Sequence, residues 1–449
     1  MKKYLCLIIT ALSTWASVAH ATDFKGYMYR VEIMTPGGSL PFIVMSDERS
    51  SPNTLLGVQV VPIILNGDER LDCDVSKSRS MSFDAEPGYL SRFMRRTVST
   101  TALSFPQFDS VIEWDRWYGY GIENQPSWTG RWIKRRGQEY VELPVVVTPI
   151  KWTVPRTDDQ RFIAFPDSVQ PNWKGKGNFD GIWSVKFESS DDHAIGKFEV
   201  DENQIASGTF MTTTGDYRFL AGRVDGNLMR LSTFDGAHAF LFHARMQDDG
   251  TIEGDFWSGN WWHETWTAVR DDDAALPDAF EQTVIADEDA LDDMVFKNLQ
   301  GEPTRVLDVL DESNAPARII EIFGTWCPNC SDAGRELVSL REQYGDNLAV
   351  VGLAFEVTED FERSVQQVKH HHEHIGTDWP ILIAGLSDKD KASQALPVLD
   401  KVRSYPTLIF LDRHNEVQGV YSGFSGPATG DAYIKQRERF EQLIESMID

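Results

Sequence analysis

Residues 323–330 are Phe-Gly-Thr-Trp-Cys-Pro-Asn-Cys, with Cys327 and Cys330 placed where an apolar strand gives way to a helix. Cys327 takes the N-cap position, and Pro328 takes the first helical position, where a missing N–H costs nothing. The positive end of a helix dipole stabilises a thiolate, so we predict that Cys327 is the attacking nucleophile. Cys330, one turn further on, is then placed to resolve a mixed disulfide.

The sequence around this stretch alternates between strands and helices. Ala333, Leu337, Leu340 and Tyr344 form one apolar stripe, which predicts a helix over 328–344. This order predicts a central mixed sheet with helices on both faces. The other expected strands are 318–323, 348–355, 381–384, 407–411 and 417–421, and the other expected helices are 359–374 and 431–447.

Residues 323–330 resemble the aromatic-x-x-Trp-Cys-x-x-Cys signature of thioredoxins, and they are most similar to the TlpA/ResA group of disulfide reductases of the bacterial envelope. Phe296–Gly301 resembles the strand and turn that precede the fold in that group, and Tyr405-Pro406-Thr407 resembles its cis-proline loop. The resemblance covers residues 295–449. It implies an α/β thioredoxin-like domain with thiol–disulfide oxidoreductase activity.

The resemblance also implies roles for three further residues. Pro406 is expected to be the cis-proline beside the cysteines, and Trp326 is expected to shield the first sulfur. Glu321 lies six residues before Cys327 and on the same strand face as Phe323, so we expect a buried carboxyl with a raised pKa that takes the proton of Cys330. The sequence departs from the family pattern at two places. Gly324 stands where the family usually has an aromatic residue. The Pro-Asn dipeptide between the cysteines is not typical of one particular redox potential.

A C-x-x-C pair has other interpretations. Half of a zinc site would need a second pair of ligands, which the sequence does not offer at suitable spacing. We therefore expect no cofactor or metal beyond the redox-active disulfide. A cluster of histidines that includes His370 and His374 could bind copper, or it could suit the C-terminal end of a helix.

The N-terminal region is predicted to be β-rich. Short apolar runs separated by turn signals predict a β-rich domain over 22–170. Four Asp-Gly dipeptides (180–181, 225–226, 235–236 and 249–250) predict hairpins within an antiparallel barrel or sandwich over 177–271. Residues 272–294 are acidic and are expected to be a linker that leads into the last domain. The expected fold class is thus multidomain, with this β-rich region before an α/β domain.

Residues 1–21 have the features of a cleaved signal peptide: Lys2 and Lys3, a short apolar run, and Ala19-His20-Ala21. A retained anchor is the alternative. The expected location is the periplasm or another extracytoplasmic compartment, with no membrane span in the mature chain. Beyond Cys6, Cys327 and Cys330, the remaining cysteine is Cys73, which is either buried and inert or involved in redox or intermolecular pairing.

The chain carries a formal net charge of −26, which disfavours nucleic acid and anionic lipid as partners. The leading hypothesis is an exported thiol–disulfide oxidoreductase that reduces disulfides of client proteins and is itself reduced by an envelope electron donor. The alternative is a ligand- or copper-binding protein that uses the C-x-x-C for metal delivery or redox sensing. Trp257, Trp261, Trp262 and Trp266 could form a sugar platform or pack in the β region.

Overall fold

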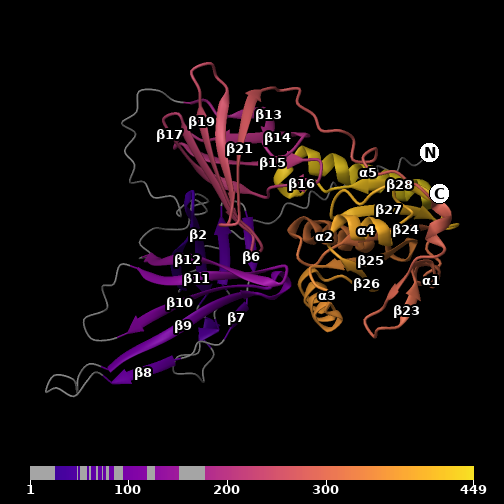
Figure 1. The fold of residues 1–449 in the computed structure, drawn as a ribbon, viewed down its shortest axis with the longest axis horizontal. Helices are drawn as coiled ribbons and strands as arrows, with labels where there is room; N and C mark the ends of the chain where they lie inside the picture. The colour runs from indigo at the N-terminus through magenta and orange to yellow at the C-terminus, as the bar shows by residue number, and fades with distance from the viewer. Residues whose placement is uncertain are drawn as a thin grey trace, which may run out of the picture.

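The computed structural model describes residues 26–47, 49–50, 58–59, 62–66, 69–72, 74–76, 80–84, 95–118, 127–150 and 177–448. Residues 1–21, for which a signal peptide is expected, and Cys73 lie outside these residues. Figure 1 shows three parts: an N-terminal sheet in indigo and purple, a magenta barrel, and an orange-to-yellow α/β domain. No helix in the described parts of the chain is long and apolar enough to cross a membrane.

The N-terminal part is an antiparallel ten-stranded sheet with the path β6-β5-β2-β1-β12-β11-β10-β9-β7, and β8 also pairs with β9. A two-residue turn joins its first two strands, since Thr35 pairs with Gly38. A separate pair is formed by β3 (Arg49–Ser50) and β4 (Val58–Gln59). The strands of the large sheet are β1 (Gly26–Thr35), β2 (Gly38–Asp47), β5 (Pro62–Asn66), β6 (Glu69–Asp72), β7 (Asp74–Ser76), β8 (Ser80–Asp84), β9 (Arg95–Phe105), β10 (Ser110–Tyr118), β11 (Trp128–Arg136) and β12 (Glu139–Ile150), with the 3-10 turn η2 (Pro106–Phe108) after β9.

The second part is an eight-stranded antiparallel barrel, so the sequence-based choice between barrel and sandwich is settled. The sheet closes because β14 pairs with β15 as well as with β13. Phe210, Phe242, Phe256 and Trp266 pack together inside it. The barrel strands are β13 (Gly181–Phe187), β14 (His193–Val200), β15 (Ile205–Thr212), β17 (Leu220–Asp225), β18 (Leu228–Phe234), β19 (Ala239–Met246), β20 (Ile252–Ser258) and β21 (Trp262–Arg270), and the short β16 (Gly215–Asp216) adds to β15.

Three of the four predicted Asp-Gly hairpins are present. The connections at 225–226, 235–236 and 249–250 lie between β17 and β18, β18 and β19, and β19 and β20. The prediction for 180–181 is wrong, because Gly181 already pairs with Phe198 as the first residue of β13. A positive φ of 115° explains the glycine there without a hairpin.

The barrel and the N-terminal sheet share a hydrophobic core. Phe234, at the end of β18, is fully buried among residues of the first sheet. Its ring stacks on Phe42 at 4.9 Å and meets the edges of Phe105 and Trp132 at 5.5 and 5.4 Å. The tip of the β18–β19 hairpin therefore holds the first two parts together.

The third part has a seven-stranded mixed sheet in the order β23-β22-β26-β25-β24-β27-β28 with helices on both faces, as predicted. The sequence analysis missed the short α1 and α4. The elements are β22 (Val295–Lys297), β23 (Pro303–Arg305), α1 (Val306–Asp311), β24 (Ala317–Phe323), α2 (Pro328–Tyr344), η5 (Gly345–Asn347), β25 (Leu348–Glu356), α3 (Phe361–Ile375), β26 (Ile381–Leu386), α4 (Lys389–Ala395), β27 (Thr407–Asp412), β28 (Val417–Ser422), η6 (Pro427–Thr429) and α5 (Asp431–Ile448).

The acidic segment before this domain is packed along it rather than extended into solvent. Phe280 lies against the rings of Tyr421 and Phe410, at 4.9 and 6.2 Å. Asp278 pairs with Arg439 at 2.9 Å, and a short turn, η4 (Glu288–Leu291), follows. The segment thus fixes the start of the α/β domain to its last helix and edge strands.

We predict that Phe234→Ala will loosen the joint between the barrel and the first sheet. Removal of a buried aromatic ring costs about 3–5 kcal/mol of unfolding free energy. Urea unfolding followed by tryptophan fluorescence checks this, because Trp132 lies against Phe234. The control is Val269→Ala. The Val269 side chain is exposed, so its removal should change the free energy of unfolding by less than about 0.5 kcal/mol. Equal midpoints for the two variants would contradict the shared core.

Candidate active site

The two cysteines lie at the start of α2 as the sequence predicts, and both are free thiols. Cys327 is the N-cap residue in extended conformation, with Pro328 at the first helical position. The backbone N–H of Cys330 donates to Cys327 Sγ at 3.2 Å. Helix N–H groups without intrahelical partners stabilise negative charge on such a sulfur. Cys327 keeps 7% of its surface exposed, whereas Cys330 is fully buried.

Burial raises the pKa of the Cys330 thiol well above its usual value, and contact with Cys327 and the nearby Glu321 add to the increase. Cys330 therefore stays protonated near neutral pH. When Cys327 enters a mixed disulfide, its hydrogen bond and charge interaction with Cys330 are lost, and one cause of the raised pKa of Cys330 is removed. The order of reactivity between the two sulfurs follows from this difference.

Glu321 is completely buried in β24, as its place in the strand predicts. Burial raises its pKa to about 8, with a smaller opposing effect from Trp379. Neither carboxyl oxygen makes a hydrogen bond in the part of the chain that the structure describes. A carboxyl without fixed partners beside Cys330 can hold or release a proton near neutral pH.

The Tyr405–Pro406 peptide bond is cis, as the resemblance implies. This loop lies against the reactive sulfur, because the Cys327 thiol donates to the carbonyl oxygen of Tyr405 at 3.6 Å. Pro406 itself lacks an N–H, so the backbone edge beside Cys327 remains free of that donor. The structure thus brings Cys327, Cys330, Glu321 and the 405–406 loop together.

Trp326 packs across Gly324 and explains the departure at that position. Its indole N–H donates to the carbonyl oxygen of Phe355 at 2.9 Å, and its ring meets Tyr405 at 5.7 Å. A Cβ at Gly324 would lie 2.2 Å from the indole nitrogen, so an aromatic residue there would displace Trp326. Glycine at 324 therefore allows the indole to lie beside the reactive sulfur.

Sequence reasoning missed a buried carboxylate that supports the loop before the cysteines. Glu356 ends β25, next to β24, and its Oε1 accepts from the N–H and hydroxyl of Thr325 at 3.1 and 2.8 Å. Burial raises the pKa of Glu356. Arg363 lies 3.8 Å from its other oxygen and also pairs with Asp109 of the first sheet at 3.2 Å. A polar residue at the carboxyl end of a buried strand was the available signal.

Lys389, the first residue of α4, was also missed. Burial lowers its pKa, and the charge of Cys327 acts in the opposite direction, which places this ammonium within electrostatic reach of the reactive sulfur. The lysine donates to the carbonyl oxygen of Arg403. A cation at this place favours the thiolate form of Cys327. The sequence carried no signal for it, because 62 residues of chain separate the two side chains.

A hairpin of the barrel covers the first turn of α2. Arg218 pairs with Asp332 and donates to the carbonyl oxygen of Pro328 at 3.3 Å. In return, the amide of Asn329 donates to the backbone carbonyl of Asp216 at 3.3 Å. These contacts join β16 and the residues after it to the Cys-Pro-Asn-Cys turn itself (Figure 1).

Asp216 fixes the same hairpin to the loop before α5. Its carboxylate accepts from the backbone N–H of Gly426 at 2.6 Å and from that of Arg218 at 2.7 Å. Burial raises the pKa of Asp216 to about 6; the carboxylate of Asp332 adds to this, and Arg218 opposes it. The barrel hairpin thus forms one side of the active site.

The histidine cluster is part of the structure of α3. His374 lies 3.1 Å from a guanidinium nitrogen of Arg335, and His371 is buried against Phe323. His372 contacts Thr377 after the helix ends. Among the described residues no group of three or more His, Cys, Asp or Glu side chains could hold a metal ion.

The tryptophan cluster divides between two environments. Trp266 is buried in the barrel core, and Trp261 lies 5.8 Å from Trp132 of the first sheet. Trp262 is 45% exposed and donates to Glu264 at 3.0 Å. The four indoles therefore do not form one flat platform.

No family model matches the chain. Over 131 residues the chain is 28% identical to the thioredoxin-like protein YneN of Bacillus subtilis (strain 168). The matched segment is 29% of this chain and 68% of that protein. The C-terminal third of the chain has a thioredoxin-like α/β fold, with a C-x-x-C at the start of its helix α2. The β-rich region precedes it as a further unit, with the barrel next to the domain.

Solved structures of oxidoreductases are similar to about a third of the chain. A thiol-disulfide oxidoreductase from Bacteroides fragilis shares 18% identity, with a TM-score of 0.23, over 32% of this chain and 94% of its own. A DsbF homologue from Corynebacterium diphtheriae also shares 18%, with a TM-score of 0.25, over 35% and 93%.

We predict that Glu321→Gln will change how stability depends on pH. The folded protein keeps a proton on Glu321 that the unfolded chain loses above about pH 4.5, so wild-type stability falls as pH rises towards 8. Between pH 5.5 and 8 this fall should exceed that of the variant by about 3 kcal/mol. Urea unfolding followed at the helical circular dichroism band measures it, because the described α-helices all lie in the C-terminal domain.

Glu342→Gln is the matched control, since Glu342 is exposed on α2. Its pH profile should follow that of the wild type. If Glu321→Gln also ran parallel to the wild type, Glu321 would not hold the proton assigned to it.

Proposed function

We propose that the protein is an exported reductase of client disulfides that works through the Cys327-Pro328-Asn329-Cys330 turn. The observation that carries this proposal is the position of Cys327 Sγ. It accepts the N–H of Cys330 at the start of a helix, beside a cis-proline loop and above a buried carboxyl.

The reaction proceeds by two exchanges. The Cys327 thiolate attacks one sulfur of a client disulfide, and the S–S bond breaks to release a client thiolate that takes a proton from water. Cys330 then loses its proton, and its sulfur attacks Cys327 Sγ to release the second client sulfur. The client gains two electrons and two protons, and Cys327 and Cys330 are left as a disulfide.

The surrounding groups serve these two steps. Lys389 and the N-terminal end of α2 favour the Cys327 thiolate before attack. The ionised fraction of Glu321 accepts the proton of Cys330 during resolution, because a pKa of about 8 leaves a minority of the carboxyl groups deprotonated near neutral pH. The backbone edge at Tyr405–Pro406 lies where an extended client segment can run past Cys327.

Direction and location are parts of the same proposal. The features of residues 1–21 support export, and the resemblance to envelope reductases supports reduction. An extracytoplasmic reductase needs a dithiol electron donor that returns two electrons to the Cys327–Cys330 disulfide. The barrel and first sheet would select the client.

We predict that Cys330→Ser will accumulate mixed disulfides, because nothing then resolves the bond to Cys327. The variant should lose at least about 100-fold in the catalysed reduction of insulin by dithiothreitol. For the adduct, the pre-reduced variant is mixed with insulin without dithiothreitol and quenched with acid, and mass spectrometry should then find the insulin chain attached to Cys327. Cys327→Ser should be equally inactive but should form no adduct.

Ser331→Ala is the control, because it changes a neighbouring side chain in the first turn of α2 without removing a thiol. It removes a weak contact to the carbonyl oxygen of Cys327 at 3.5 Å and should retain activity. If the Cys330→Ser protein carried no client adduct above the level of the Cys327→Ser/Cys330→Ser double variant, the proposed exchange would be refuted.

A further inference from the structure

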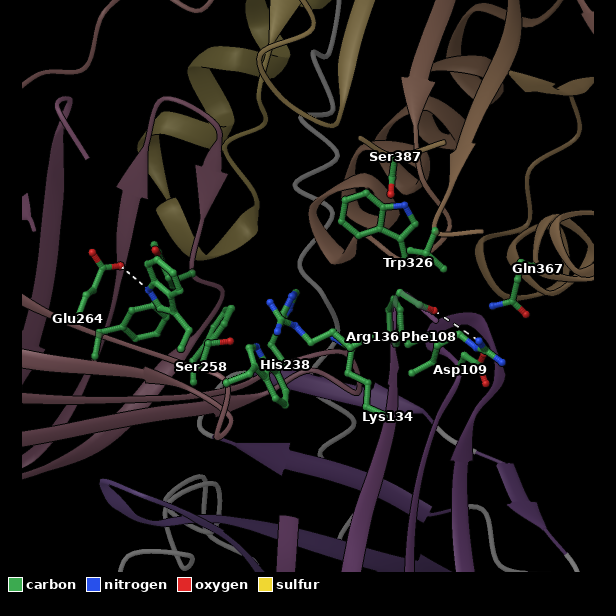
Figure 2. Close-up of a pocket in the computed structure, with 18 of the residues that line it drawn as sticks. Phe108, Asp109, Lys134, Arg136, His238, Ser258, Glu264, Trp326, Gln367 and Ser387 are labelled. Carbon is green, nitrogen blue, oxygen red and sulfur yellow. Dashed lines mark hydrogen bonds and ion pairs between the residues drawn. The ribbon is translucent and has the colours of Figure 1, made fainter. Parts of the chain in front are cut away.

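A cleft with a volume of about 620 Å³ lies between the three parts of the protein, directly beside the active site. The first sheet supplies Lys134 and Arg136, the barrel supplies His238, and the α/β domain supplies Trp326 and Ser387. Figure 2 shows Trp326 above the opening, with Lys134, Arg136 and His238 facing it from the other side.

The cleft adjoins a smaller cavity of about 210 Å³ in which Cys327 is exposed. Tyr217, His238, Phe240 and Trp326 line both spaces. Because the barrel hairpin covers the first turn of α2, a substrate that reaches Cys327 through this cavity also lies against the cleft.

The cleft is positively charged in a chain whose net charge is −26. Its lining has four basic residues, Lys134, Arg135, Arg136 and Arg363, and two acidic ones. Both carboxylates already have partners. Asp109 binds Arg135 and Arg363 at 2.7 and 3.2 Å, and Glu264 accepts from Trp262 and from the N–H of Ser189 at 3.0 Å each.

Arg136 and Lys134 have no carboxylate within ion-pair distance among the described residues, and the buried Asp235 carboxylate acts on Lys134 from further away. The Arg136 guanidinium lies 5.4 Å from the ring centre of Trp261, and the Lys134 ammonium lies 5.7 Å from the same ring. Lys134 donates to the carbonyl oxygen of Ala237, and burial lowers its pKa to about 8. A bound anion would compensate for the cost of placing these cations together.

The aromatic side chains of the cleft set a second requirement for the ligand, after its negative charge. Trp261, Trp262, Tyr217 and Phe240 also line the cleft. A ligand with carboxylates and an extended backbone satisfies both features, because guanidinium groups bind carboxylates in pairs of hydrogen bonds and indoles pack on peptide groups. Elsewhere the acidic chain repels such a ligand, so the cleft would concentrate and orient it.

We propose that this cleft binds an acidic peptide segment adjoining the disulfide that Cys327 attacks. The inference rests on the proposed function and specifies its substrate class. Arg136 holds a carboxylate of the segment, Lys134 supplies a second positive charge, and the peptide runs past Trp326 so that its disulfide lies at Cys327.

The test uses full-length reduced protein and three peptides of equal length that each contain one disulfide. The residues next to the cysteines are glutamates in one peptide, glutamines in the second and lysines in the third. At low salt the kcat/KM for the glutamate peptide should exceed that for the lysine peptide by about tenfold or more, and 0.5 M NaCl should reduce this ratio.

Arg136→Gln should lower the glutamate-to-lysine ratio to about threefold or less, because it removes the unpaired guanidinium. Arg245→Gln is the matched control, since Arg245 is an exposed residue of β19 outside the cleft, and it should keep the full ratio. Circular dichroism of both variants checks that they are folded.

The results with the three peptides distinguish a failure of the acidic-segment proposal from a failure of the reductase proposal. Equal rates for all three peptides, or a glutamate preference that Arg136→Gln leaves intact, would overturn the acidic-segment proposal while the reductase proposal stands. Failure to reduce even the glutamine peptide would instead overturn the proposed reductase function.

Discussion

The hydrogen bond from the Cys330 N–H to Cys327 Sγ is the contact on which the chemistry of this protein depends. It places one sulfur at the positive end of α2 and leaves the other inside the domain. The same short turn therefore separates a nucleophile that keeps 7% of its surface exposed from a fully buried, protonated thiol. The apolar strand β24 imposes this arrangement, because it carries Glu321 into the core directly beneath the turn.

The barrel changes what can reach that sulfur. Its hairpin at β16 binds the side and backbone of the first turn of α2 through Asp216 and Arg218. The first sheet is held in place by Phe234 and by the pair Arg363–Asp109, so all three parts meet around one cleft. Client choice would then depend on residues far from the cysteines in sequence, such as Arg136, which lies 191 positions before Cys327.

The local features of the site were predictable from sequence, whereas the contacts between parts were not. Cys327, Pro328 and the 328–344 helix follow from capping and periodicity, and the burial of Glu321 follows from strand alternation. Asp216 looked like one of many acidic residues, and its role depends on packing against Gly426, 210 residues further along the chain. Barrel closure likewise depends on the pairing of β14 with β15, which an alternating pattern alone does not specify.

The most direct measurement of the difference between the two sulfurs is alkylation of the reduced, folded protein with iodoacetamide, followed by peptide mass spectrometry. Cys327 should be modified at least about 100-fold faster than Cys330, because only Cys327 keeps some exposed surface and it lies at the helix start. In urea the two rates should become similar. Equal rates in the folded protein, or faster modification of Cys330, would contradict the assignment of Cys327 as the nucleophile.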